Sequence, residues 1–160
     1  MTAQRLDRVL TCYRIGDPDG AHPIFDATGS THYPGRWNTP ASPMIYACQH
    51  YSTAMLEKLV HGSGRIPPNQ HFIEITIPNG AEYEMLNTAV LPDWHAEVAT
   101  QSKAYGEAWQ QEKRSLILIV PSVVARIEKN ILINPEHSEF GRITTSLHQP
   151  VWWDKRLFAP

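Results

Sequence analysis

The sequence predicts an α+β protein whose sheet is mixed or mostly antiparallel and carries few helices. Short apolar runs alternate with clusters of turn-forming residues along the whole chain. Only two segments show the three-and-four spacing of apolar residues that is typical of a helix, and strands and helices do not alternate as in βαβ units. The length of 160 residues is typical of one domain, so we expect a single domain over residues 1–160.

The first half of the chain is predicted to hold two strands, a long loop and a helix. Leu10–Ile15 reads as the first strand, and residues 16–43 form a loop that presents side chains. A short buried strand over Met44–Cys48 precedes a helix over Thr53–His61, with Ser52 as its N-cap and Gly62 after its last turn.

The second half is predicted to hold the second helix and the remaining strands. The helix begins at Leu91-Pro92-Asp93 and runs to about residue 112, with large apolar residues along one stripe. The segment Ser115–Val120 is apolar on both faces and is therefore expected in the centre of the sheet. The other predicted strands are His71–Ile77, Glu82–Leu86, Asn130–Asn134 and Arg142–Ser146.

Composition excludes several classes of protein. With 14 basic and 16 acidic residues, the formal net charge of −2 lacks the positive field of a protein that binds nucleic acid or anionic lipid directly. The longest purely apolar run, Leu116–Val120, is too short to span a membrane. The N-terminus lacks the apolar stretch of a signal peptide, and the two cysteines and the histidines show no zinc-site spacing. We therefore expect a cytoplasmic protein without a metal site.

Three polar residues are candidates for chemistry. Arg36, which follows a glycine in the predicted loop, has the donor geometry to bind a phosphate; the alternative, which the residue type alone favours, is a surface arginine in a salt bridge. Glu57 lies at the margin of the apolar face of the first helix, where partial burial raises the pKa of a carboxyl group; the alternative is a boundary glutamate paired with Lys58. Ser122 follows the central strand, where it either contacts a ligand or caps a turn.

These residues belong to a longer pattern. It contains Tyr13-Arg14-Ile15, Gly35-Arg36-Trp37-Asn38, Ile45-Tyr46-Ala47, Ala54 with Glu57, Pro92-Asp93-Trp94, Gly106 with Trp109, Val120-Pro121-Ser122, Asn130 to His137 and Trp153-Asp154. In this order and spacing the chain resembles the RES-domain toxins of RES–Xre toxin–antitoxin pairs. The arginine, glutamate and serine of the family name match Arg36 (or Arg14), Glu57 and Ser122.

The resemblance implies an ADP-ribosyltransferase-like fold and an enzyme that degrades NAD⁺ by cleaving the nicotinamide–ribose bond, as a glycohydrolase or phosphorylase. NAD⁺ is then the substrate, and no further cofactor is expected. Glu57 is expected to face the ribose as it becomes positive, and Arg36, with Arg14 as a second cation, to bind the pyrophosphate. Tyr46 would offer an aromatic face to the nicotinamide, and Ser122 would bind the amide or the ribose.

Two other functions stay open at this point. A protein ADP-ribosyltransferase would use the same site and pass ADP-ribose to a side chain, and a non-catalytic ligand-binding or interaction module would not need Glu57. The resemblance also implies an Xre-type helix-turn-helix antitoxin as partner and a homodimer within the complex. In that complex the antitoxin, rather than this chain, would contact DNA.

Overall fold

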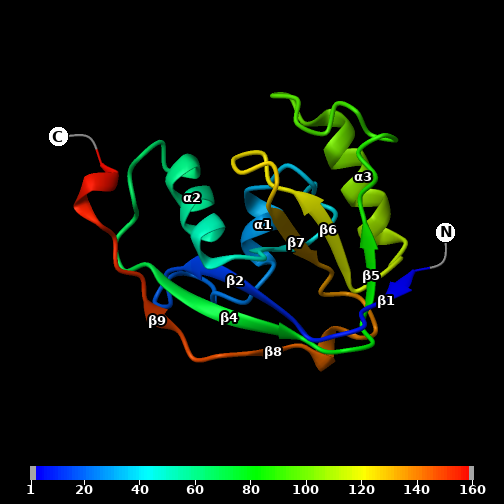
Figure 1. Ribbon diagram of the computed structural model, residues 1–160, viewed down its shortest axis with the longest axis horizontal. Helices are drawn as coiled ribbons and strands as arrows, with labels where there is room; N and C mark the ends of the chain where they lie inside the picture. Colours follow the sequence, from blue (N-terminus) through cyan, green and yellow to red (C-terminus); the bar gives the residue numbers. More distant parts are fainter. Residues whose placement is uncertain (1–2, 159–160) are drawn as a thin grey trace.

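Within the described residues the fold consists of one mixed sheet and three α-helices, which confirms the predicted α+β class (Figure 1). The computed structural model describes residues 3–158. The helices are α1 (Thr28–His32), α2 (Tyr51–His61) and α3 (Thr100–Gln111), and Phe140–Arg142 and Lys155–Leu157 form 3₁₀ turns. The strands are β1 (Gln4–Arg5), β2 (Leu10–Gly16), β3 (Ile45–Cys48), β4 (His71–Ile77), β5 (Glu82–Met85), β6 (Ile117–Pro121), β7 (Lys129–Ile133), β8 (Thr144–Thr145) and β9 (Gln149–Pro150).

The sheet runs in the order β1-β5-β6-β7-β3-β2-β4-β8, and β9 also pairs with β4. Only β5 and β6 are parallel among the paired strands of residues 3–158. Isoleucines of β4 and β6 share one buried cluster, although three strands separate β4 from β6 in the sheet order. The sheet is therefore curled around this cluster, which forms the larger part of the core.

Two helices cover the other face of the sheet at different places. On α3, Trp109 packs with Leu118 of β6 and Leu132 of β7, and Tyr46 of β3 packs against this cluster. On α2, Ala54 packs with Ile15 of β2 and Cys48 of β3. Alternate residues of a strand face the same way, so Tyr46 and Cys48 lie on one face, and the border between the two helix-covered clusters crosses β3.

The pairing between β2 and β3 is nearly absent. The strand β2 pairs with β4 along its whole length, but it pairs with β3 only where Tyr13 lies opposite Cys48. The side chain of Arg14 fills the resulting gap: its Nη1 donates to the carbonyl of Tyr46 (2.8 Å) and its Nε donates to the carbonyl of Ile24 (2.6 Å). A backbone carbonyl that lacks a ladder partner is thus satisfied by a side chain.

Some predicted boundaries were wrong. The second helix begins at Thr100 rather than at Leu91, because residues 91–99 form turns whose carbonyls at Trp94 and Ala96 accept hydrogen bonds from Arg36. The predicted loop over residues 16–43 contains the short helix α1. The first predicted helix begins at Tyr51, so Ser52 lies inside it and is not its N-cap. Among residues 3–158, no helix is long and apolar enough to cross a bilayer.

Candidate active site

Glu57 is the centre of the candidate site. It projects from α2 toward the ends of β6 and β7, and its side chain is 20% exposed. Its Oε1 accepts hydrogen bonds from Ser122 Oγ (2.8 Å) and Asn130 Nδ2 (3.0 Å). The Nε2 of His61, one helical turn further on, lies 3.6 Å from Oε2. One carboxylate oxygen is therefore fixed by two neutral donors, and the other faces a more exposed region.

The ionisation of Glu57 differs from the expectation. Burial on its own raises the pKa of this carboxyl, as predicted, but the interaction with His61 and the hydrogen bonds from Asn130 and Ser122 outweigh burial, and the pKa of Glu57 lies below its ordinary value. The prediction of a raised pKa was wrong because the sequence did not reveal these donors. Glu57 is an anion at neutral pH.

Ser122 is fully buried and its hydroxyl has no unused hydrogen-bonding capacity. It donates to Glu57, and it accepts from the backbone N–H groups of Val124 (3.2 Å) and Ala125 (3.1 Å). A serine hydroxyl offers one donor and two acceptor positions, and all three are occupied. In this arrangement Ser122 orients Glu57, and the direct contact with a ligand that the sequence suggested would require one of these bonds to break.

Asn130 was not singled out as a site residue from the sequence, although it belongs to the motif pattern. It is the strand partner of Cys48, on the face of β3 and β7 that Glu57 approaches. Its Nδ2 holds Glu57, and its Oδ1 is a buried acceptor without a hydrogen-bond partner among residues 3–158. The position of Asn130 at the start of a strand gave no signal of this role, because the partner lies 73 residues away in the sequence.

Tyr46 lies on the same face of β3, two residues before Cys48. Its hydroxyl donates to Asn38 Oδ1 (2.7 Å) and accepts from the backbone N–H of Trp37 (3.0 Å). Its ring lies against Gly35, where a Cβ atom would come within 2.7 Å of the ring. Burial raises the pKa of Tyr46, so the residue is a neutral aromatic group that fixes the loop carrying Arg36.

Arg36 is held by the loop between β5 and α3. Its Nη1 donates to the carbonyls of Trp94 (3.1 Å) and Ala96 (2.6 Å), and its Nε and Nη2 have no hydrogen-bond partner within residues 3–158. The helix α3 supports the loop that carries Arg36, since Lys103 Nζ donates to the carbonyls of Gly35 (2.5 Å) and Asn38 (3.2 Å). The guanidinium thus keeps donors for an anion while its position is fixed.

A chain of contacts joins Arg36 to the Glu57 group. The guanidinium of Arg126 lies 5.8 Å from the centre of the Trp94 ring, and Trp94 holds Arg36 through its carbonyl. Arg126 belongs to the same turn between β6 and β7 as Ser122, which binds Glu57. The structure therefore brings Glu57, Ser122 and Tyr46 onto one face of the sheet, with Arg36 at its border and Arg14 in the adjoining gap.

The two arginines of the site, Arg14 and Arg36, have no acidic partner within residues 3–158. Elsewhere five arginines are ion-paired with carboxylates: Arg5, Arg8, Arg114, Arg142 and Arg156. Arg14 and Arg36 form no ion pair with any residue of the described part of the chain, and the same is true there of Arg65, Arg126 and the five lysines. Desolvation lowers the pKa of Arg14, while the charge of Asp26 acts against this effect. Such unpaired cations favour the binding of an anionic ligand.

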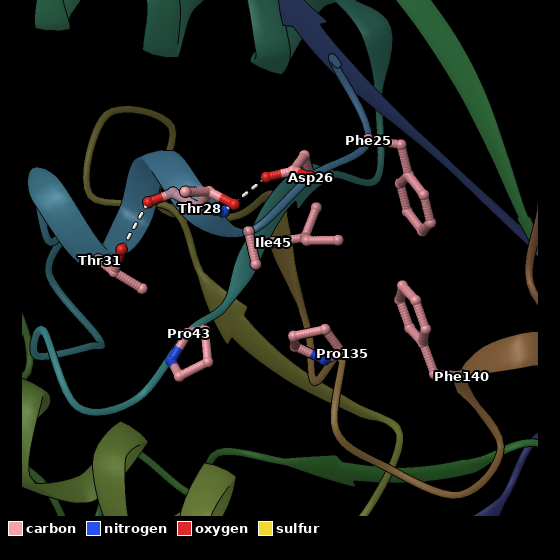
Figure 2. A pocket seen from close by; sticks show the side chains of 9 residues that line it. Phe25, Asp26, Thr28, Thr31, Pro43, Ile45, Pro135 and Phe140 are labelled. Carbon is pink, nitrogen blue, oxygen red and sulfur yellow. Dashed lines mark hydrogen bonds between the residues drawn. The ribbon is translucent and has the colours of Figure 1, made fainter. Parts of the chain in front are cut away.

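A hollow of about 370 Å³ lies on the opposite side of β3. It is lined by Ile45, whose side chain alternates with that of Tyr46, and its wall includes the stacked rings of Phe25 and Phe140, 5.5 Å apart (Figure 2). None of the candidate site residues lines it.

The described residues contain one group with the composition of a metal site, formed by Glu82, His137 and Glu139. Its ligand atoms are already engaged: His137 Nδ1 accepts from the backbone of Glu139, so Nε2 donates to Glu82 (2.9 Å), and Glu139 pairs with Arg142 (2.7 Å). These bonds describe a structural network that joins β5 to the segment after β7.

Comparison with known proteins places the chain in a family. The model of the RES domain matches residues 11–154. The "Prs ADP-ribosylating toxin" of Sphingobium sp. (strain YBL2) is 39% identical over 128 residues, which cover 77% of this chain and 80% of that protein. A "Toxin Res" of Photorhabdus laumondii is 31% identical over 136 residues, covering 83% and 86%.

A solved structure shares the fold. A chain in the crystal structure of the M. tuberculosis MbcT–MbcA toxin–antitoxin complex matches 92% of this chain with a TM-score of 0.71 at 14% identity, and 86% of that chain is covered. The match over residues 11–154 includes Arg14, Arg36, Tyr46, Glu57 and Ser122. The chain therefore belongs to the RES-domain toxin family.

Proposed function

We propose that the chain is the toxin of a toxin–antitoxin pair and that it cleaves the nicotinamide–ribose bond of NAD⁺. The observation that carries this proposal is an ionised Glu57, fixed by Ser122 and Asn130, on the face of the sheet whose border holds Arg36 with its Nε and Nη2 unbound within residues 3–158. NAD⁺ combines the two features that such a site suits: a pyrophosphate that binds cations, and a ribose that becomes positive when nicotinamide leaves.

The chemistry needs few groups. Nicotinamide leaves as a neutral molecule because its ring carries a positive charge in NAD⁺, so no general acid is required. The electron pair of the broken C–N bond goes to the ring nitrogen, and the ribose acquires oxocarbenium character. The Oε2 of Glu57, which accepts no hydrogen bond from Ser122 or Asn130, stabilises this charge directly or through the ribose hydroxyls. Water then completes hydrolysis to ADP-ribose and a proton, and phosphate as the acceptor would give the phosphorylated product.

The other residues bind the substrate and hold the groups of the site in position. Arg36 offers Nε and Nη2 to the pyrophosphate, and Arg14 supplies a second positive charge from the gap between β2 and β3. Tyr46 fixes the Arg36 loop and presents its ring toward the nicotinamide side, while Ser122 and Asn130 hold the carboxylate. No metal or further cofactor takes part in this proposal.

The test is the release of nicotinamide from NAD⁺, followed by chromatography. The purified wild-type protein is expected to release nicotinamide, and Glu57→Gln, which keeps the size and the hydrogen bonds of the side chain but not its charge, is expected to lose at least 100-fold in rate, in keeping with the weight of electrostatic stabilisation in catalysis. A wild-type protein that binds NAD⁺ without releasing nicotinamide would support the non-catalytic module instead.

A second function is favoured by a specific finding, because the Sphingobium relative carries the name of an ADP-ribosylating toxin. Transfer of ADP-ribose to a protein uses the same bond cleavage with a side chain as acceptor. NAD⁺ labelled in its adenylate part separates the two in a cell lysate: label on a protein band identifies transfer, whereas free ADP-ribose or its phosphate identifies hydrolysis or phosphorolysis.

The solved complex supports an antitoxin as partner, and the sequence resemblance supports an Xre-type helix-turn-helix protein and a homodimer within the assembly. Co-purification of this chain with the product of an adjacent helix-turn-helix gene, with the mass of the complex measured by light scattering, tests both points. A chain that stays alone in the presence of that product would contradict this part of the proposal.

A further inference from the structure

Two histidines meet where β9 lies beside the start of β4 (Figure 1). His71 is the first residue of β4, and His148 directly precedes β9. Their Nδ1 atoms lie 2.9 Å apart, and the two rings stand edge to face with their centres 4.8 Å apart. His71 is half-buried and His148 is exposed, so solvent reaches the pair. Neither residue belongs to the candidate active site.

The neighbours of His71 fix its tautomer. Asn69 Nδ2 donates to Asp17 Oδ1 and Asp19 Oδ2, both at 2.8 Å. Because carboxylates only accept, the nitrogen of the amide faces them, and its Oδ1 faces Nε2 of His71 at 3.2 Å. This Nε2 therefore carries the proton and donates, and Nδ1 of His71 presents a lone pair toward His148. Histidines that bind metals are commonly oriented in this way, by a hydrogen bond from the other ring nitrogen.

The two Nδ1 atoms are placed to share either a proton or a metal ion. Without a metal, Nδ1 of His148 donates to the lone pair of His71. At metal–nitrogen distances of about 2.0–2.1 Å, two ligands at a right angle are about 2.9 Å apart. The observed separation of 2.9 Å therefore suits neighbouring positions of square-planar or octahedral coordination. A turn of the exposed His148 ring about its own side-chain bonds directs its lone pair to the same ion.

We propose that His71 and His148 bind a divalent transition-metal ion, Cu²⁺ or Ni²⁺, through their Nδ1 atoms. Tetragonal coordination by nitrogen is typical of these two ions, and water would fill the other positions. Two residues are fewer than in the group around His137, but there the carboxylates and the imidazole are already engaged. Within residues 3–158 the two Nδ1 atoms are bound only to each other.

The ion would attach the C-terminal segment to β4. Directly after β9, the backbone N–H of Val151 donates to the carbonyl of Gln70 (3.0 Å), and Val151 packs with Ala54 of α2. The two histidines are 77 positions apart in the sequence and meet only in the folded chain. A metal bound at both therefore stabilises the folded state and raises its melting temperature.

Titration calorimetry with Ni²⁺ tests the site on the full chain without an affinity tag. The wild-type protein is expected to bind one equivalent, and His148→Ala, which leaves one ligand, is expected to bind at least tenfold more weakly. His95→Ala removes an exposed histidine elsewhere and is expected to change nothing. Melting temperatures without metal check that the variants fold. Added Ni²⁺ should raise the melting temperature of the wild type and of His95→Ala, but not that of His148→Ala.

A variant of Asn69 and the spectrum of the Cu²⁺-loaded protein test the ligands themselves. Asn69→Gly suits the backbone φ of +59° and removes the bond to Nε2 of His71, so it is expected to weaken Ni²⁺ binding about tenfold. Electron paramagnetic resonance should show Cu²⁺ coupled to two nitrogens in the wild type and to fewer in His148→Ala. Equal Ni²⁺ affinity of the wild type and His148→Ala would overturn the inference, as would no Ni²⁺ binding by the wild type or a Cu²⁺ signal without nitrogen coupling. None of these readouts depends on nicotinamide release, so the outcome is independent of the proposed function.

Discussion

The substitution Ser122→Ala probes the network that holds Glu57. It removes the donor 2.8 Å from Glu57 Oε1 and the acceptor of the backbone N–H groups of Val124 and Ala125. A hydrogen bond to a charged group contributes about 1.5–3 kcal/mol, and each buried donor left unsatisfied costs more. We expect Ser122→Ala to lower the free energy of unfolding at pH 7 by about 2–4 kcal/mol, a large share of the stability of an ordinary domain.

The pH dependence of this loss identifies its cause. The pKa of Glu57 is lowered in the folded protein, so its contribution to stability is present above the unfolded value, about 4.3, and is lost as the pH falls through the folded pKa. The difference between wild type and Ser122→Ala should therefore be largest at pH 7 and shrink below pH 4. What remains at low pH belongs to the two backbone N–H groups.

Urea denaturation at pH 7 and pH 3 measures both values, and the double variant with Glu57→Gln isolates the coupling between the two side chains. Ser52→Ala, at an exposed serine of the same helix α2, is the matched control and is expected to stay within about 0.5 kcal/mol of the wild type. A loss below 1 kcal/mol, or the same loss at both pH values, would refute the reasoning.

Two further substitutions test neighbouring parts of the structure. Asn130→Asp replaces the amide 3.0 Å from Glu57 by a group of like charge, which raises the pKa of Glu57. The acid limb of the pH profile of nicotinamide release should therefore move to higher pH by about one unit or more. An acid limb that does not move would contradict the contact between Asn130 and Glu57. Gly106→Ala places a Cβ against the carbonyl of Trp37, so we expect a loss of about 1–3 kcal/mol by thermal denaturation. Gly29→Ala, with open space at its Cβ, is the control, and equal melting temperatures for the two variants would speak against the close packing of α3 on the Arg36 loop.

The fold class and the order of the strands along the chain were predictable because both follow from local patterns. The apolar segment before Ser122 became the buried strand β6, and the helix carrying Glu57 began within two residues of its predicted start. The start of α3 was not predictable, because the turns before it are stabilised by Arg36, 58 residues away from Trp94.

For the candidate site too, the residue types were predictable from local patterns, whereas the contacts between distant residues were not. Arg36, Glu57 and Ser122 were recognisable as residue types in suitable places, but the bond between Ser122 and Glu57 joins residues 65 apart in the sequence. Local spacing therefore predicted that burial raises the pKa of Glu57, but it could not reveal the hydrogen-bond donors that lower this pKa instead. Asn130 was missed as a site residue for the same reason, since its contact with Glu57 arises only when α2 packs on the sheet.

The central claim is that Glu57 meets the substrate as an anion held by Ser122 and Asn130. Carbon-13 NMR of the glutamate side-chain carboxyls, with the signal of Glu57 assigned from its absence in Glu57→Gln, measures this ionisation directly. We predict that Glu57 titrates below the ordinary value of about 4.3 and that Ser122→Ala raises its pKa. A pKa of Glu57 above that value in the wild type would contradict the claim.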